Sequence, residues 1–254
     1  MGQYKLGLVL SGGGMSCAAQ IGVLKVFEEE GISPSIISGT SGGAIVGALL
    51  ANNIACKEML KVFKKVNLFS FYHFARKKAG LFDIESYNLL EPYFPADSFE
   101  ALNIPLIINT TQLQKGETVY FSKGKLIKKI FASAAFPGLF APVKIGNHLH
   151  ADGGILENLP SNIIRKKCRK LIAINVNATP ELPSARMSSS LEVMSRALRL
   201  NLAQQQSYQP EDCDLLISPK AIANHTIFSK SSVDELYEIG YKEGKKVLTK
   251  IRGL

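Results

Sequence analysis

Short apolar segments alternate with helical segments along almost the whole chain. The first apolar segment, Tyr4–Leu10, shows no clean alternation of polar and apolar residues, which is typical of a strand covered on both faces. Further strands are predicted at 36–38, 106–110, 118–121, 143–145, 148–151, 171–176 and 215–217. Helices are predicted at 18–27, 42–51, 56–66, 83–90, 126–135, 161–167, 191–208 and 233–251. This order predicts an α/β fold with a mostly parallel sheet and helices on both faces.

The length and composition suit a single folded domain. The chain has 254 residues, of which 46% are hydrophobic and 20% charged, so it can bury a large core. No polar linker or internal repeat divides it, and we expect one domain over residues 1–254. The four cysteines form no Cys-x-x-Cys pair, which argues against a zinc site or a disulfide framework and fits a reducing compartment.

No apolar run is long enough to cross a membrane. The longest, at 44–51, is far shorter than the roughly 18 residues of a spanning helix. The apolar segment near the N-terminus runs directly into glycines, which fits a core strand rather than a signal peptide. We therefore expect a cytoplasmic protein, peripheral at the inner membrane face.

The chain carries a basic surplus. Thirty Lys and Arg against 21 Asp and Glu leave a formal charge of +9, which favours an anionic partner such as a membrane surface. Basic and aromatic residues are interleaved at 57–78, which predicts a segment that contacts anionic lipid or covers an acyl pocket. A core helix with a solvated basic edge is an equal alternative. No nucleic-acid-binding motif occurs, so nucleic acid is not an expected partner.

Two glycine-rich turns, each between a predicted strand and a predicted helix, carry the chemical signal. The first, Gly12-Gly13-Gly14-Met15, offers consecutive backbone N–H groups in front of a helix, which suits an anion. A plain tight turn is the alternative. A dinucleotide site is disfavoured because Cys17 stands at the third glycine position of that fingerprint.

The second turn, Gly39-Thr40-Ser41-Gly42-Gly43, fits the pattern Gly-x-Ser-x-Gly. A serine on a sharp strand-to-helix turn projects its hydroxyl clear of the sheet, and neighbouring glycines let that turn form. Ser41 is therefore a candidate nucleophile. The alternative is a serine that caps the following helix.

A serine nucleophile needs a base, and the histidines give little support for one. His225 stands alone in a loop, His73 lies among aromatic residues, and His148 and His150 fit surface or supporting positions. Asp152 is the better candidate because it ends a predicted strand and precedes two glycines. An ordinary Asp is a weak base, so this one needs burial or a serine contact. The alternative is an Asp that caps a turn.

Several ordered motifs resemble those of the patatin-like phospholipase family. Its signature is a glycine-rich oxyanion motif after the first strand, then Gly-x-Ser-x-Gly, then Asp-Gly-Gly or Asp-Gly-Ala. These occur here in that order, at Gly12-Gly13-Gly14, residues 39–43 and Asp152-Gly153-Gly154. The stretch Ala-Ser-Ala-Ala-Phe-Pro-Gly-Leu-Phe-Ala-Pro at 132–142 resembles a further family segment. The likeness extends from residue 5 to about residue 248.

The resemblance implies a three-layer α/β/α sandwich and a serine acyl hydrolase of the phospholipase A or lysophospholipase type. It implies that Ser41 attacks an ester carbonyl of a membrane lipid. Asp152 then takes the serine proton and later activates the deacylating water, while backbone N–H groups hold the oxyanion. The implied oxyanion residues are Gly12, Gly13, Gly14 and Met15, and the supporting glycines are Gly39, Gly43, Gly153 and Gly154. No metal or organic cofactor is implied.

One departure from the family pattern affects the oxyanion motif. The family usually has Gly-Gly-Gly-x-Arg/Lys-Gly, whereas Ser16 stands here at the basic position and Cys17 at the last glycine. The N–H donors remain, so we expect reduced or redirected activity. The alternative function is a catalytically weakened lipid- or acyl-chain-binding protein on the same scaffold.

Overall fold

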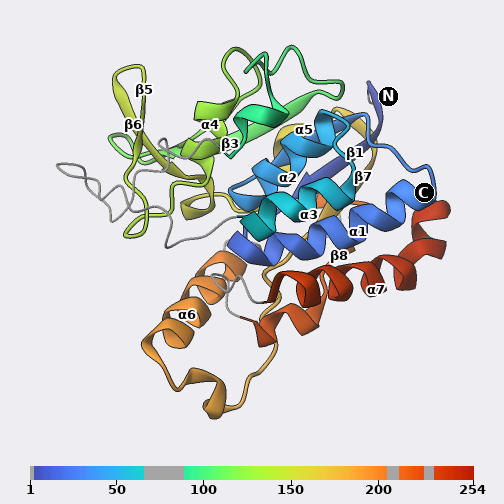
Figure 1. The fold of residues 1–254 in the computed structure, drawn as a ribbon, viewed down its shortest axis with the longest axis vertical. Coiled ribbons are helices and arrows are strands. Elements are labelled where there is room, and N and C mark those ends of the chain that lie inside the picture. The colour runs from blue at the N-terminus through green and yellow to red at the C-terminus, as the bar shows by residue number, and fades with distance from the viewer. Residues whose placement is uncertain (1–2, 66–88, 205–211, 226–231) are drawn as a thin grey trace.

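The computed structural model describes residues 3–65, 89–204, 212–225 and 232–254. Within these residues an eight-stranded sheet forms the centre of the molecule, in the order β5-β6-β3-β2-β1-β7-β8 with β4 beside β3 (Figure 1). The strands are β1 (Tyr4–Leu10), β2 (Ile36–Gly39), β3 (Leu106–Gln112), β4 (Glu117–Phe121), β5 (Val143–Ile145), β6 (His148–Asp152), β7 (Cys168–Ile174) and β8 (Leu215–Ile217).

The sheet is mixed, with a parallel centre. Strand β1 pairs in parallel with β2 and β7, and the parallel arrangement continues through β2–β3 and β7–β8. Strands β4 and β6 pair antiparallel with β3, and β5 pairs antiparallel with β6. The α-helices are α1 (Ala18–Glu29), α2 (Gly42–Ala51), α3 (Cys56–Lys65), α4 (Ile127–Ser133), α5 (Asn162–Arg165), α6 (Ser190–Gln204) and α7 (Val233–Arg252).

Alternate residues of the central strands enter two separate cores. Leu8 and Leu10 of β1 belong to the large core that the sheet forms with residues of α1, α2, α3, α4 and α7. Val9, between them, belongs to a smaller core with Ile164 of α5. Side chains alternate between the two faces of a strand, so both faces of the sheet are covered. The predicted fold class, a three-layer α/β/α sandwich, is confirmed.

Helices α1 and α7 lie in backbone contact on the outside of the larger layer (Figure 1). A Cβ atom on Gly240 would lie only 1.9 Å from the carbonyl oxygen of Ala19, and one on Gly22 only 2.0 Å from that of Tyr237. Glycine at both positions therefore sets how closely the two helices approach. The contact fixes α1, the helix that follows the first glycine-rich turn.

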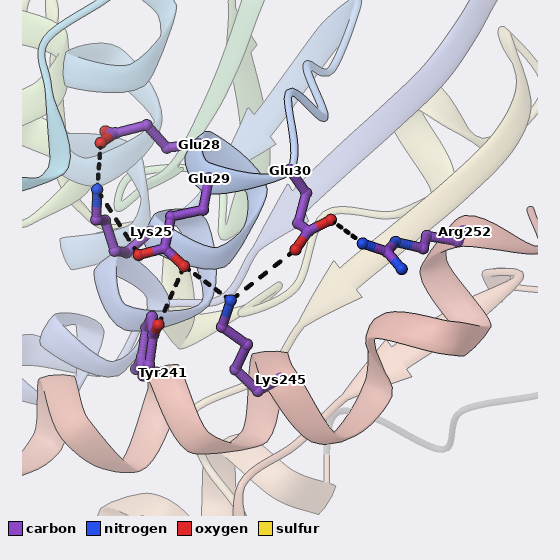
Figure 2. Close-up of polar contacts among 7 residues, drawn as sticks. All are labelled: Lys25, Glu28, Glu29, Glu30, Tyr241, Lys245 and Arg252. Atoms are coloured by element: carbon purple, nitrogen blue, oxygen red, sulfur yellow. Dashed lines mark hydrogen bonds and ion pairs between the residues drawn. The ribbon is translucent and has the colours of Figure 1, made fainter.

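Polar side-chain contacts also join α1 and α7 near their C-terminal ends (Figure 2). Lys245 Nζ lies 2.8 Å from a carboxylate oxygen of Glu29, and the Tyr241 hydroxyl donates to the same carboxylate at 3.0 Å. Arg252 pairs with Glu30 in the same way. These side chains are partly or largely exposed to solvent, so each pair contributes little to stability.

Most element predictions agree with the structure, and β1, α2, β5 and β8 match to the residue. The strand predicted at 171–176 instead runs over Cys168–Ile174, because Cys168 pairs with Tyr4 although exposed basic residues follow it. The helix predicted at 161–167 is limited to Asn162–Arg165. The helix predicted at 83–90 falls mostly outside the described residues.

Among the described helices, none combines the length and apolar character needed to cross a membrane.

Candidate active site

Ser41 lies on the turn between β2 and α2. Its backbone angles, φ 53° and ψ −124°, are strained for a residue with a side chain. Two glycines make this turn possible. A Cβ on Gly43 would lie 2.4 Å from the Ser11 carbonyl oxygen, and one on Gly39 2.6 Å from the Gly43 carbonyl oxygen. The chain therefore bends sharply here and directs Ser41 away from the strand.

The register of β3 brings Ser41 and Asp152 together. Gly39 at the end of β2 pairs with Ile108, and Asp152 at the end of β6 pairs with Thr110, two residues further along β3. Ser41 follows Gly39 by two residues, so both side chains reach the same level of the sheet. The Ser41 hydroxyl donates a hydrogen bond of 2.6 Å to Asp152 Oδ2.

The carboxyl group of Asp152 is buried and accepts two hydrogen bonds. Its Oδ1 accepts the N–H of Gly154 at 2.8 Å, and its Oδ2 accepts the Ser41 hydroxyl. Burial disfavours the ionised form and raises the pKa of Asp152 to about 6, although both hydrogen bonds act in the opposite direction. At neutral pH this carboxylate is mostly ionised and is a stronger base than an ordinary Asp.

The glycine loop, residues 11–17, lies beside this turn. The N–H of Gly12 donates to the carbonyl oxygen of Asn158 at 3.0 Å, so that donor is already used. Within the described residues, the N–H groups of Gly13, Gly14 and Met15 have no acceptor, and all three residues line the cavity above the Ser–Asp pair. Three unused N–H donors on residues that line the cavity can hold an oxyanion there.

The chain beyond β7 supports the glycine loop from the other side. Val176 donates its N–H to Ser11 Oγ at 3.0 Å, and the Asn177 side-chain amide donates to the Gly12 carbonyl oxygen at 2.6 Å. Sequence reasoning missed this support, and no local signal reveals it, because Asn177 lies 165 positions from Gly12.

Two further polar residues around Ser41 were also missed. Ser133 Oγ in α4 accepts the backbone N–H of Ser41 at 2.9 Å. The hydroxyl of Thr40 donates to Asn109 Oδ1 at 2.7 Å. Ser133 falls within the 132–142 segment that resembles the family, and this was the one signal that could have identified it. Both contacts hold the turn in place.

An apolar cavity of about 410 Å³ lies over the Ser–Asp pair. This volume is in the range of about 300–1,000 Å³ that is usual for small-molecule sites. Its walls come from α2, α3, α6 and the segment from the end of α4 to residue 140, and include Ile45, Val62, Phe131, Phe136, Leu198 and Leu202. The Ser–Asp pair and the glycine-loop residues with free N–H groups therefore lie together in the lining of a mostly apolar cavity.

The described histidines have other contacts. His150 Nδ1 lies 2.8 Å from Thr110 Oγ1, and His225 Nδ1 lies 3.8 Å from a carboxylate oxygen of Glu235. His148 is partly exposed on β6, and His73 lies outside the described residues. In the described ranges no cluster of three His, Cys, Asp or Glu side chains has a metal-binding arrangement.

Comparison with known families agrees with this fold. The family model for patatin-like phospholipases matches residues 8–163, and the chain therefore belongs to the patatin-like phospholipase family. The resemblance inferred from the motifs is confirmed.

Similar proteins extend the match over nearly the whole chain. "Lysophospholipase nte1" of Aspergillus fumigatus is 27% identical over 97% of this chain, and human "Patatin-like phospholipase domain-containing protein 6" is 27% identical over 95%. The chain spans only 18% and 20% of the lengths of these two relatives.

Solved structures share the fold at lower identity. The crystal structure of VipD from Legionella pneumophila aligns with a TM-score of 0.57 and 14% identity, covering 98% of this chain and 67% of that one. Human GIVD cytosolic phospholipase A2 aligns with a TM-score of 0.50 and 13% identity, covering 98% and 58%. At such identities the likeness concerns the fold alone.

Proposed function

We propose that this chain is a lipid acyl hydrolase of the phospholipase A or lysophospholipase type that cleaves carboxylic esters through Ser41 and Asp152. The observation that carries the proposal is the 2.6 Å hydrogen bond between these two side chains in the lining of an apolar cavity. Membership in the patatin-like phospholipase family and the names of the similar lysophospholipases support the same substrate class.

The reaction has two steps. In the first, Ser41 Oγ attacks the ester carbonyl carbon while Asp152 accepts its proton, and the carbonyl oxygen becomes an oxyanion near the free N–H groups of the glycine loop. Collapse of this intermediate breaks the ester C–O bond, and Asp152 returns the proton to the leaving alcohol. In the second step Asp152 takes a proton from water, the resulting nucleophile attacks the acyl-enzyme, and Ser41 regains its proton as the fatty acid leaves.

Fewer backbone N–H groups are free to bind the oxyanion than the glycine-rich motif suggests. Gly13, Gly14 and Met15 offer free N–H groups, whereas that of Gly12 is bonded to Asn158. We assign the oxyanion contacts to these three residues and a supporting role to Gly12. The apolar walls of the cavity suit the acyl chain of the substrate.

We also propose that the chain works in the cytoplasm as a peripheral protein at anionic membrane. Helix α3 supports this: Val62 and Phe63 line the cavity, while Lys57, Lys61 and Lys64 are exposed on the same helix. Such a helix can bring the cavity to a lipid surface through its basic face.

Replacement of the two reacting side chains tests the proposed chemistry. Ser41→Ala and Asp152→Asn are each expected to lower hydrolysis of a short-chain nitrophenyl ester by at least about 1,000-fold, because nucleophile and base act as one unit. A fluorophosphonate probe should label the wild type but not Ser41→Ala. Ser122→Ala, an exposed serine outside the cavity lining, is the matched control and should retain full activity.

The same experiment separates the alternative function. A wild type that hydrolyses the ester no faster than Ser41→Ala, yet binds a fatty acid, would be a catalytically weakened acyl-chain-binding protein. Product analysis by mass spectrometry on mixed lipids then identifies the ester bond that an active wild type cleaves.

A further inference from the structure

Arg199 of α6 is a buried cation in contact with the glycine loop. Only 2% of its surface is exposed. Its Nη2 donates to Ser16 Oγ at 2.9 Å and to the carbonyl oxygen of His225 at 2.8 Å. Its Nη1 is buried and has no hydrogen-bond partner within the described residues. A buried, incompletely paired guanidinium is unfavourable for folding, so a purely stabilising role explains it poorly.

The charge of Arg199 persists in this environment. Burial lowers the pKa of the guanidinium to about 10, which still leaves it protonated at neutral pH. A fixed positive charge is therefore in direct contact with the glycine loop at Ser16.

We propose that Arg199 is a positioning residue for acyl transfer, and that it acts by holding the glycine loop through Ser16 so that the three free N–H groups keep facing the cavity. This inference rests on the proposed function. Ser16 stands where the family motif carries a basic residue, and Arg199 brings a basic group to that place from 183 positions away.

Helix α6 also forms part of the cavity wall. Leu198 and Leu202, on either side of Arg199 in the sequence, line the cavity. The Arg199–Ser16 hydrogen bond therefore links the wall that contacts the acyl chain to the loop that contacts the oxyanion. Loss of this bond is expected to misplace the N–H donors, which lowers kcat, while apolar binding and KM change little.

A set of five variants tests the proposal. Arg199→Met removes the charge and the donors, Arg199→Lys retains a charge and a donor, and Ser16→Ala removes the acceptor. The double variant Ser16→Ala/Arg199→Met shows whether the two residues act through one contact. Arg196→Met is the matched control: Arg196 lies three residues earlier on α6 and also has a buried Nη1 without a partner in the described residues, but its Nη2 donates to the Pro180 carbonyl oxygen at 2.9 Å and not to the glycine loop.

The kinetic readout is kcat per active site, with active sites counted by the fluorophosphonate probe. We expect Arg199→Met to lower kcat by about 100-fold with KM within about threefold of the wild type, as for a misplaced catalytic group. Arg199→Lys should recover part of the loss, and the double variant should be no worse than Arg199→Met alone. Arg196→Met should stay within about threefold of wild-type kcat.

Amide hydrogen exchange over residues 11–20 gives a second readout that does not depend on hydrolysis. Faster exchange of the loop in Arg199→Met, but not in Arg196→Met, supports the proposal. The proposal is overturned if a folded Arg199→Met has the kcat and the loop exchange of the wild type. It is also overturned if Arg196→Met loses as much kcat and loop protection as Arg199→Met. If Arg199→Met does not fold, the proposal is overturned when Ser16→Ala and Arg199→Lys both show the kcat and the loop exchange of the wild type.

The outcome is separate from that of the proposed function. A wild type without Ser41-dependent hydrolysis refutes the enzyme, whereas the exchange data still decide whether Arg199 orders the loop. Hydrolysis that depends on Ser41 but is indifferent to Arg199 refutes only the positioning role.

Discussion

Ser41 and Asp152 each occupy an unfavourable state in the folded protein. A non-glycine residue held at φ 53° carries a strain of about 1–3 kcal/mol. The buried Asp152 carboxylate loses solvation that two hydrogen bonds only partly restore. Both states persist because the surrounding elements impose them. This is the expected pattern where a site needs a nucleophile on a turn and a base of raised pKa.

The raised pKa of Asp152 predicts how activity depends on pH. The base must be ionised to accept the Ser41 proton, so kcat/KM should rise between pH 5 and pH 7 with an apparent pKa of about 6 and then level off. A pH–rate profile on an uncharged ester, whose own ionisation does not change, measures this directly. A profile already flat from pH 4.5 upward would contradict the assignment of Asp152 as the base.

The raised pKa of Asp152 also predicts how the stability of the protein depends on pH. This dependence checks the pKa without a measurement of activity. The pKa of Asp152 in the folded state, about 6, lies above the ordinary Asp value of 3.8, so the folded state binds more protons between these values. Stability is therefore lost as the pH rises through this window, by about 3 kcal/mol in total. Asp152→Asn lacks this titration. The free energy of unfolding of Asp152→Asn minus that of the wild type, measured in urea, should therefore be larger at pH 8 than at pH 4. An equal difference at both pH values would show that the carboxyl is not perturbed.

At the scale of elements, the site depends on how closely helices and turns approach one another. Helix α1 begins directly after the glycine loop, and α7 packs on its outer side. The α1–α7 contact brings backbone against backbone, because neither Gly22 nor Gly240 has a side chain to separate them. Such a contact has no room to adjust, so an added methyl group must displace a whole helix.

This contact predicts a large effect for a small substitution. Gly240→Ala places a Cβ 1.9 Å from the Ala19 carbonyl oxygen and should lower the free energy of unfolding by about 3 kcal/mol, despite alanine's better helix propensity. Gly253→Ala is the matched control, because its Cβ meets backbone atoms only at 3.6 Å. Urea unfolding measures both variants. Equal stability of Gly240→Ala and the wild type would mean that the helices are further apart.

At the scale of the whole molecule, the formal charge of +9 sets the expected partner. The basic segment predicted at 57–78 is only partly described, up to Lys65 at the end of α3. In that part α3 has a basic exposed face and an apolar buried face, which fits the alternative of a core helix with a solvated basic edge and does not exclude contact with lipid. Contact with lipid stays a prediction, as does the single domain over residues 1–254.

Vesicle binding tests the membrane contact. Charge reversal at Arg76, Lys77 and Lys78 should weaken binding to vesicles that contain anionic lipid by more than about tenfold, since each basic group near the surface contributes about 1 kcal/mol. Binding of the wild type should also fall at high salt. Cosedimentation measures both effects.

The matched control reverses three exposed lysines outside the cavity lining, Lys115, Lys123 and Lys144, with the same change in net charge. An equal loss in this control would mean that net charge alone, and not the segment at 57–78, drives binding. Unchanged binding in the first variant would contradict the membrane contact at that segment.

Local signals were sufficient for much of the fold and for the identity of the candidate site. The boundaries of β1 and α2 follow from apolar patterning and from glycines, which act within a few residues. The candidate nucleophile and base were each identified in the same way, because both stand in glycine-rich turns at the end of a strand. The start of β7 was misplaced because two basic residues, Arg169 and Lys170, follow its first residue, and only pairing with β1 shows that they belong to the sheet.

Tertiary structure decided everything that depends on contact between distant segments. Ser41 and Asp152 lie 111 positions apart, and the pairing of both β2 and β6 with β3 brings Ser41 Oγ within 2.6 Å of Asp152 Oδ2. The raised pKa of Asp152 follows from burial, which no short stretch of sequence encodes. Arg199 reaches Ser16 across 183 positions. Patterning along a chain determines which residues face a core, whereas the packing of that core determines which of them meet.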